Sequence, residues 1–332
     1  MNRKFNTNEI VEAGLITGII VVLMLITGYI PILNIVSTLL LPLPVTVLAL
    51  RRGYKLSLLS LIIGTILVSM VYDPITAVQS AVTFGFLGIS LAYCIKNEKS
   101  FGETIIVMTL AASAASVLSV VIYSSLILKD GVKGLYSQAA NVITMFKDSY
   151  EGMKKTLGTN NLNSSAIKQY DEMFKIMTPE FLIKMFLGCL FVYSLITSYV
   201  NYIVAEKVLK RLKYEVKEPT PFRLINFDAK LGLAVVIIMF AGSILAKYKI
   251  PAGEYMYSSA NYVLMFILIV QGISVITYLL LEKLKMPKAG VIAIIVLGIS
   301  IIGSIAVYIG LADLIFDIRK INKNSLFNKR GK

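Results

Sequence analysis

The strongest constraint on the fold is a series of apolar runs, each about as long as a bilayer is thick. Examples are Leu15 to Gly28, Leu56 to Val71, Ile105 to Leu128 and Val263 to Leu281. A helix needs about 20 apolar residues to cross roughly 30 Å of hydrocarbon. Inside a bilayer the backbone polar groups must be bonded within helices or a closed barrel. We therefore expect an all-α, polytopic membrane helix bundle.

The composition agrees with a membrane protein. Of 332 residues, 57% are hydrophobic and 16% are charged, whereas soluble domains carry about 25% charged residues. The net charge of +14 does not indicate a nucleic-acid partner, because the basic residues lie between apolar segments and form no basic face. Topology signals and attraction to anionic headgroups explain them better. The expected partner is the lipid bilayer.

Nine segments are predicted to span the membrane, which gives about eight or nine transmembrane helices. Met1 to Lys4 resembles the basic start of a secretory signal, but no small-x-small cleavage site follows, so we expect a retained first helix. The predicted segments are residues 9–29, 32–50, 56–72, 75–95, 103–128, 180–204, 229–246, 257–281 and 289–312.

The basic residues predict a cytoplasmic N-terminus in a bacterial plasma membrane. In this orientation the short outer loops carry only Lys247 and Lys249. The positive-inside rule supports this arrangement. The cytoplasmic Lys and Arg residues then lie at positions 3–4, 51–55, 96–99, 207–230 and 283–288.

The ninth segment conflicts with this rule. A full crossing would place the basic tail from Arg319 to Lys332 on the outer side. Residues 289–318 would form about 45 Å of helix, which is too short for two passes. A re-entrant hairpin broken near Gly298 or Gly303 would keep the tail cytoplasmic. The sequence leaves both alternatives open.

Hydrophilic stretches predict four parts: a membrane bundle (1–204), a basic cytoplasmic linker (205–230), C-terminal membrane helices (231–318) and a basic tail (319–332). The bundle carries an extracytoplasmic helical insertion at 129–178. Apolar residues recur there at three- and four-residue steps from Val132 to Leu157, which predicts an amphipathic helix.

A second, shorter helix is expected after residues 158–163, marked by Ile167, Tyr170, Met173, Phe174 and Met177. The insertion either forms a lid over an outward-facing pocket or lies in the headgroup region. Thr178, Pro179 and Glu180 then predict the start of the next span, as N-cap, first residue and acidic first turn.

Several kinds of chemistry are missing. The chain has no histidine, which excludes histidine-based catalysis and metal ligation. No G-x-x-x-x-G-K-[ST] loop is present to bind nucleotide. Acidic residues avoid the span centres, with Asp313 at a flank, which disfavours proton-coupled transport. We predict no catalytic residue, no metal site and no cofactor, and hence a protein that is not an enzyme.

Two groups of residues are candidates for binding. Gln271 lies deep in its segment and is expected to bond to a neighbouring helix. Small residues on the first span either pack internally or dock another membrane subunit. The candidate solute-binding residues are Asn34, Asp73, Gln79, Asn261 and Gln271, and the candidate docking residues are Ala13, Gly14, Thr17 and Gly18.

One stretch resembles the S components of energy-coupling-factor vitamin transporters. It runs from Leu41-Pro42-Leu43-Pro44 through Arg51-Arg52-Gly53 to Asp73-Pro74. The resemblance implies a six-helix N-terminal part that binds a small solute and docks a coupling subunit and its ATPase module. The family often has A-x-x-x-A at its docking face, and Ala13 with Thr17 and Gly14 with Gly18 match this inexactly. The three extra segments also depart from the six-helix pattern.

A second resemblance covers essentially the whole chain. It is to the YybS-like family of uncharacterised bacterial membrane proteins, which carry a domain of unknown function and are distantly similar to S components. The residues that carry it are Gln271, Gly272, Gly310, Asp313, Asp317 and Arg319.

The expected function is therefore a plasma-membrane subunit that binds or transports a small solute without chemistry of its own. The alternative is a non-catalytic scaffold of cell-envelope or division machinery, similar in general character to MreD. A pocket lined by the outward polar groups would favour the first, and a filled bundle interior the second. An intramembrane enzyme is disfavoured by the missing catalytic groups.

Overall fold

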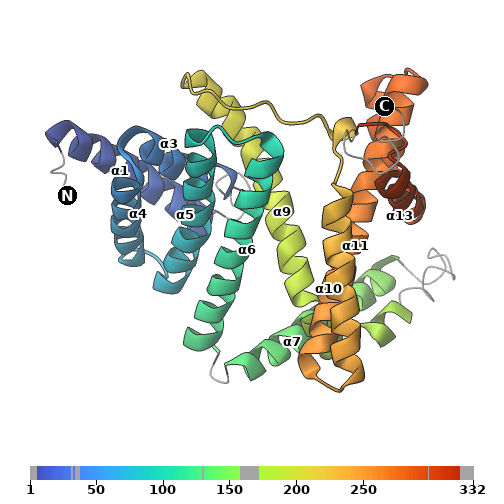
Figure 1. The fold of residues 1–332 in the computed structure, drawn as a ribbon. Coiled ribbons are helices and arrows are strands. Elements are labelled where there is room, and N and C mark those ends of the chain that lie inside the picture. Colours follow the sequence, from blue (N-terminus) through green and yellow to red (C-terminus); the bar gives the residue numbers. More distant parts are fainter. Residues whose placement is uncertain are drawn as a thin grey trace. The chain divides into compact units, whose positions relative to one another are not determined.

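The computed structural model describes residues 6–30, 33, 38–128, 131–157, 172–297 and 299–321. Every regular element in these ranges is a helix, which confirms the all-α class (Figure 1). The chain divides into two compact units. Unit 1 comprises Met1–Leu135 and Tyr193–Pro219, and unit 2 comprises Tyr136–Val192 and Thr220–Lys332.

Six helices within the described residues are long and apolar enough to cross a membrane. They overlap six of the nine predicted segments, so the chain is a multi-pass membrane protein. They are α1 (Thr7–Tyr29), α5 (Pro74–Lys96), α6 (Phe101–Leu126), α9 (Pro179–Arg211), α10 (Ala229–Lys247) and Pro251–Lys283, which consists of α11 (Pro251–Tyr278) and the π-helical η3 (Leu279–Lys283).

The other three predicted segments form shorter helices. α3 (Pro42–Arg52) has 11 residues and begins at Pro42, because a proline lacks the N–H that a later helical turn would use. α4 (Tyr54–Ser69) has 16 residues and ends before the turn at Asp73. The last segment is divided into α12 (Lys288–Leu297) and α13 (Ile299–Phe316).

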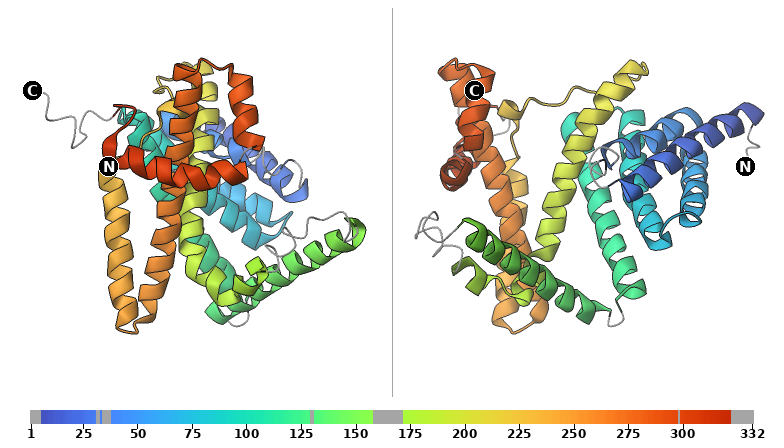
Figure 2. Two further views of the ribbon diagram at one scale, coloured as in Figure 1. Left: turned by 90° about the vertical axis from the view of Figure 1, so that its right-hand side faces the viewer. Right: turned by 180° about the vertical axis from the view of Figure 1, so that it is seen from behind.

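The division of the last segment bears on the position of the tail. α12 and α13 lie on either side of Gly298, one of the two predicted break points, whereas Gly303 lies inside α13. α12 has 10 residues and is therefore about 15 Å long, too short to cross alone. α13 crosses α11 and does not continue the line of α12 (Figure 2). The described parts of this segment thus do not form one straight helix, whereas Gly298 itself lies outside the described residues.

Side chains define several helix starts. Asp73 accepts a hydrogen bond from Thr76 N at 2.7 Å before α5, and Ser100 and Glu103 form a capping box before α6. The Thr178 hydroxyl accepts a bond from Phe181 N at 3.2 Å, which confirms the predicted start of α9. These bonds satisfy backbone N–H groups that have no partner within the helix.

The core of unit 1 is held by apolar contacts and hydroxyl bonds between helices. The Ser57 hydroxyl of α4 donates to the Val45 carbonyl of α3 at 2.7 Å, and the Thr46 hydroxyl of α3 donates to the Gly88 carbonyl of α5 at 3.0 Å. A Cβ at Gly88 would lie 2.7 Å from the Pro42 carbonyl oxygen, so glycine permits this approach. A second cluster joins α5, α6 and the C-terminal part of α9, with Leu87, Met108, Tyr202 and Leu209 buried.

Unit 2 is built around the α10–α11 hairpin, which α13 crosses (Figures 1 and 2). The N-terminal part of α9 packs closely on α11, because a Cβ at Gly188 would lie 2.6 Å from the Ser259 carbonyl oxygen. The short turn η2 (Phe222–Leu224) precedes α10.

The predicted amphipathic helix is present as α7 (Val132–Leu157), with the expected bounds. Of the second predicted helix, residues 172–176 are helical, whereas Ile167 and Tyr170 lie outside the described residues.

Candidate functional site

A buried ion pair between Asp313 and Arg319 is the most unusual polar feature of unit 2. Arg319 Nη2 lies 2.9 Å from Asp313 Oδ2, and the exposed fractions of the two side chains are 1% and 0%. Arg319 Nε donates to the same oxygen at 3.2 Å, and the Arg319 backbone N–H donates to Oδ1 at 3.3 Å. A lone charge at this depth would cost several kcal/mol, so each residue requires the other.

The remaining guanidinium hydrogens bind backbone and hydroxyl oxygens. Arg319 Nη1 donates to the Arg223 carbonyl at 2.9 Å and to Ser274 Oγ at 2.6 Å. Nη2 donates to the Ile225 carbonyl at 2.8 Å. An arginine has five N–H donors, and these contacts engage all of them. The guanidinium therefore connects the segment before α10 with α11 and with the end of α13.

Gln271 completes the cluster from α11. Its Nε2 lies 2.6 Å from both Asn226 Oδ1 and Asp313 Oδ2, and its Oε1 accepts a bond from Phe227 N at 3.0 Å. The predicted bond to a neighbouring helix is therefore confirmed. Because these contacts use both amide hydrogens and the oxygen, the side chain has no free N–H for a solute.

Two glycines allow α11 and α13 to approach closely enough for these contacts. A Cβ at Gly272 would collide with the backbone of Ala306, and a Cβ at Gly310 would collide with the Leu268 carbonyl oxygen. Close approach of small residues is a common way to pack membrane helices. It brings Gln271, the neighbour of Gly272, to the Asp313 carboxylate.

The chain reverses after α13 at Asp317, which has a left-handed backbone with φ of 49°. Asp317 N donates to the Asp313 carbonyl at 2.8 Å. Aspartate tolerates this conformation better than most residues. The reversal returns Arg319 to the Asp313 side chain. The residues of the YybS-like pattern thus lie at one place, the α11–α13 crossing and its C-terminal turn: Gln271, Gly272, Gly310, Asp313, Asp317 and Arg319.

We call Asn226, Gln271, Ser274, Asp313 and Arg319 the polar cluster. Its composition differs in part from what the sequence predicts. Asp313 lies near the end of α13, at the flank where the sequence places it, but its side chain is buried inside unit 2. Arg319, which the sequence assigns to the basic tail, is also buried there. Asn226 and Ser274 had no sequence signal, because their role depends on residues far along the chain. The side-chain N–H groups of Gln271 and Arg319 are all used in hydrogen bonds within unit 2. The cluster therefore holds α11, α13 and the segment before α10 together.

The other predicted solute-binding residues have separate surroundings where the structure describes them. Asn34 lies outside the described residues. Gln79 of α5 donates to the Ser119 carbonyl of α6 at 3.1 Å. Asn261 is half-buried on α11, about 15 Å along the helix from Gln271. Gln79 belongs to unit 1, whereas Asn261 and Gln271 belong to unit 2.

Asp73, the remaining candidate of this group, caps α5. The hydrogen bonds from Thr76 hold the pKa of the Asp73 carboxyl below its usual value. The cap is therefore fully formed at neutral pH and weakens as the pH falls through the folded-state pKa. Asp73 has a structural role at this end of unit 1.

The candidate docking residues of α1 divide between two faces. Ala13 and Thr17 are buried and face α4, where a Cβ at Gly64 would lie 3.7 Å from the Thr17 side chain. Gly14 and Gly18 are exposed, and a Cβ at either would meet nothing within 4 Å. Of these four residues, only Gly14 and Gly18 are thus left uncovered by the rest of unit 1 and available to another molecule.

Ion pairs hold α1 in this orientation. Glu12 Oε1 lies 2.8 Å from Arg51 Nη1, and Glu12 Oε2 lies 2.6 Å from Arg52 Nε. Because both arginines lie in the last turn of α3, these contacts fix one end of α1 against the rest of unit 1. The exposed face of Gly14 and Gly18 is therefore presented by an anchored helix.

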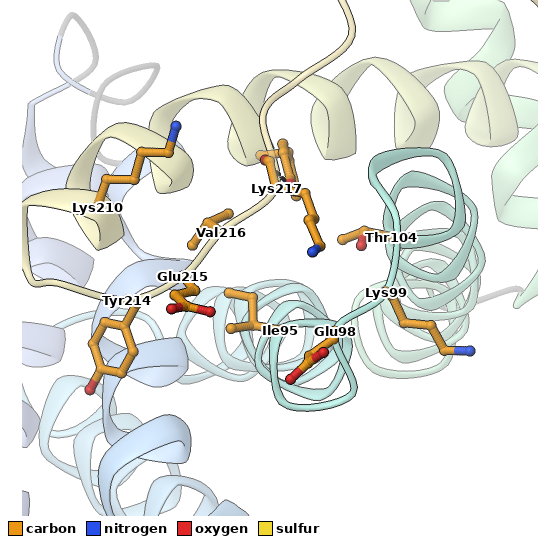
Figure 3. Close-up of a pocket in the computed structure, with 10 residues that line it drawn as sticks. Ile95, Glu98, Lys99, Thr104, Lys210, Tyr214, Glu215, Val216 and Lys217 are labelled. Atoms are coloured by element: carbon orange, nitrogen blue, oxygen red, sulfur yellow. Dashed lines mark hydrogen bonds between the residues drawn. The ribbon is translucent and has the colours of Figure 1, made fainter.

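Unit 1 also contains a cavity of about 270 Å³ (Figure 3). Glu98 and Lys99 line it from the α5–α6 connection, Thr104 lines it from the first turn of α6, and residues 214–217 line it from the segment after α9. In Figure 3 the Lys217 side chain extends toward Thr104. The lining carries both acidic and basic side chains and includes none of the predicted solute-binding residues.

Comparisons with known proteins agree with the whole-chain resemblance. The chain is 23% identical over 303 residues to the uncharacterised protein YybS of Bacillus subtilis (strain 168), covering 88% of this chain and 90% of that protein. No solved structure matches. The profile of the family described as "Predicted membrane protein (DUF2232)" matches residues 18–314. The chain therefore belongs to the DUF2232 family of membrane proteins, as its YybS-like residues indicated.

Proposed function

We propose that this protein is a non-catalytic scaffold subunit of a bacterial plasma-membrane complex, which binds a second membrane protein through α1. The binding surface is the exposed face of Gly14 and Gly18, which we call the α1 glycine face. The observation that carries the proposal is the open space beside both glycines, while the other side of the same helix is fully packed.

The α1 glycine face has the form of a helix-docking surface. Gly14 and Gly18 lie one helical turn apart and so form a shallow groove in which another helix can approach the backbone. Val11, Leu15 and Val22 beside them are large apolar side chains that are all more than half exposed. In lipid, where apolar surface alone does not drive helix association, such close backbone contact is a principal source of affinity.

The polar residues support a scaffold more than a transporter. Gln79 and Gln271 make bonds within their own units, and Asp73 caps a helix. Ion- or proton-coupled transport would require ionisable groups on a solute path. The buried Asp313 and Arg319 instead neutralise each other inside the polar cluster, and their hydrogen bonds are all made within unit 2.

A small-solute-binding role related to S components is the second candidate. The cavity of about 270 Å³ in unit 1 favours it, because Lys217 offers N–H donors beside two carboxylates. The Thr104 hydroxyl donates to the Ser100 carbonyl and can still accept a hydrogen bond from a solute. Such a lining suits a small zwitterionic or polar solute. This role would also require a partner, because the sequence lacks a Walker-type nucleotide site.

Affinity purification in mild detergent, followed by identification of the proteins and small molecules retained, distinguishes the two roles. A scaffold retains a membrane protein in stoichiometric amount and no small molecule. A solute-binding subunit retains a small molecule that is lost in a Thr104→Val and Lys217→Ala variant. Recovery of neither, from native membranes at near-native expression, would contradict both proposals.

A further inference from the structure

α7 carries an apolar face that unit 2 leaves uncovered. The side chains of Val142, Met145, Phe146 and Met153 are between 41 and 68% exposed. At 3.6 residues per turn, Val142, Phe146 and Met153 lie on one face of the helix. Ile143, at the edge of that face, is buried. We call the exposed residues Val142, Phe146 and Met153 the α7 apolar face.

The opposite side of α7 is polar. Thr144, Asp148 and Glu151 are exposed there, so the helix separates apolar from polar residues around its circumference. Lys147 and Lys154 lie between the two sides, and the Lys154 ammonium lies 5.1 Å from the centroid of the Tyr150 ring. Lysines at such a boundary can extend their ammonium groups to lipid phosphates while their methylene groups cover apolar surface.

The position of α7 in the chain and in unit 2 indicates what covers this face. α7 follows shortly after α6 and is followed by α9, and both α6 and α9 are candidate spans. Within unit 2, α7 is inclined to the α10–α11 hairpin and lies toward the end of the hairpin that carries its connecting turn (Figure 2). Spans leave the hydrocarbon at such turns, so an amphipathic helix there lies at the depth of the headgroups.

We propose that α7 is an interfacial helix, with its apolar face inserted at the boundary of headgroups and acyl chains. The occupant of the face is lipid, because the helix is joined to membrane spans and has lysines beside its apolar side chains. α7 thus rests on the bilayer surface and does not act as a lid closing on a pocket. This inference is independent of the scaffold proposal.

Fluorescence quenching in the full-length protein tests the depth of α7. Cys94 and Cys189 are replaced by Ala, a single cysteine is introduced by Phe146→Cys or by Asp148→Cys, and each is labelled with an environment-sensitive fluorophore in liposomes. Position 148 lies on the polar side, about 200° around the helix from position 146. Val142→Cys gives a second position on the apolar face, in case Phe146→Cys does not fold.

We expect nitroxide-labelled lipids to quench positions 146 and 142 about threefold or more strongly than position 148, with the opposite order for aqueous iodide. Equal iodide quenching at all three positions would show a helix in water and overturn the proposal. Protection of 142 and 146 from both quenchers would also overturn it, because a protein surface, and not lipid, would then cover the face.

Discussion

Arg319 and Asp313 form an ion pair from which water is excluded, although only six positions separate them and the chain reverses between them. The pair lies where α13 crosses α11 and where the segment before α10 returns to the hairpin. Three stretches that are distant in sequence are therefore held together by one guanidinium. The stability of unit 2 should depend strongly on this contact.

Replacing one member of the pair tests this dependence. Arg319→Met leaves the Asp313 carboxylate buried without a cation, which should cost about 3–5 kcal/mol and lower the Tm of the purified protein in detergent. Asp313→Leu combined with Arg319→Met removes both charges and should recover much of the loss. Lys320→Met, an exposed neighbouring cation, is the matched control and should melt like the wild type. If Arg319→Met alone left the Tm unchanged, the ion pair would not be needed for the stability of unit 2.

The α11–α13 crossing should be highly sensitive to added volume. Gly310→Ala places a methyl group against the Leu268 carbonyl oxygen, so we expect the helices to separate and the segment before α10 to become sensitive to protease. Gly303→Ala on the same helix meets nothing within 4 Å and should be neutral or slightly stabilising, because alanine favours helix. Equal digestion rates for the two variants would contradict the close crossing.

The orientation predicted from the basic residues can be read by thiol labelling in intact cells. Cysteines introduced at Asn160 and at Lys213 should label oppositely with a membrane-impermeant reagent, and only position 160 should react, because the insertion is expected outside and the linker inside. Position 160 lies outside the described residues, but the measurement needs only its side of the membrane. Reaction at position 213 alone would invert the proposed topology.

The basic tail should be cytoplasmic. α12 and α13 do not form one straight helix (Figure 2), and six Lys and Arg residues follow from Arg319 onward, which together favour retention inside. A cytoplasm-active reporter fused after Lys332 should therefore be active, and a periplasm-active one should be silent. The reverse pattern would mean that the segment crosses the membrane fully.

The sequence predicts local features of this fold well and long-range ones poorly. The bounds of α7 and the cap of α9 follow from periodicity and from Thr178, because both depend on neighbouring residues. The position of Asp313 at the end of its segment follows from the sequence, but its burial does not, since it depends on a crossing with residue 271 and on the left-handed turn at Asp317. Contacts between residues this far apart in the chain leave no periodic pattern in the sequence.

The candidate sites show the same limit. Ala13 and Gly14 are adjacent and both small, and the sequence assigns both to docking. Their separation into a packed side and an open side depends on where α4 lies, as the contact between Gly64 and Thr17 shows. The sequence groups the candidate solute-binding residues by their expected depth in the membrane, and depth alone does not indicate which of them share a pocket.

The most direct test of the scaffold proposal is quantitative co-purification of wild-type protein and a Gly14→Leu, Gly18→Leu variant. An Ile62→Phe, Ile66→Phe variant adds bulk at two exposed positions with the same spacing on α4 and is the matched control. We predict that the glycine variant is monodisperse, with the wild-type Tm, yet loses the membrane partner that wild type and control retain. Full retention of the partner by the glycine variant, or its aggregation, would contradict docking through α1.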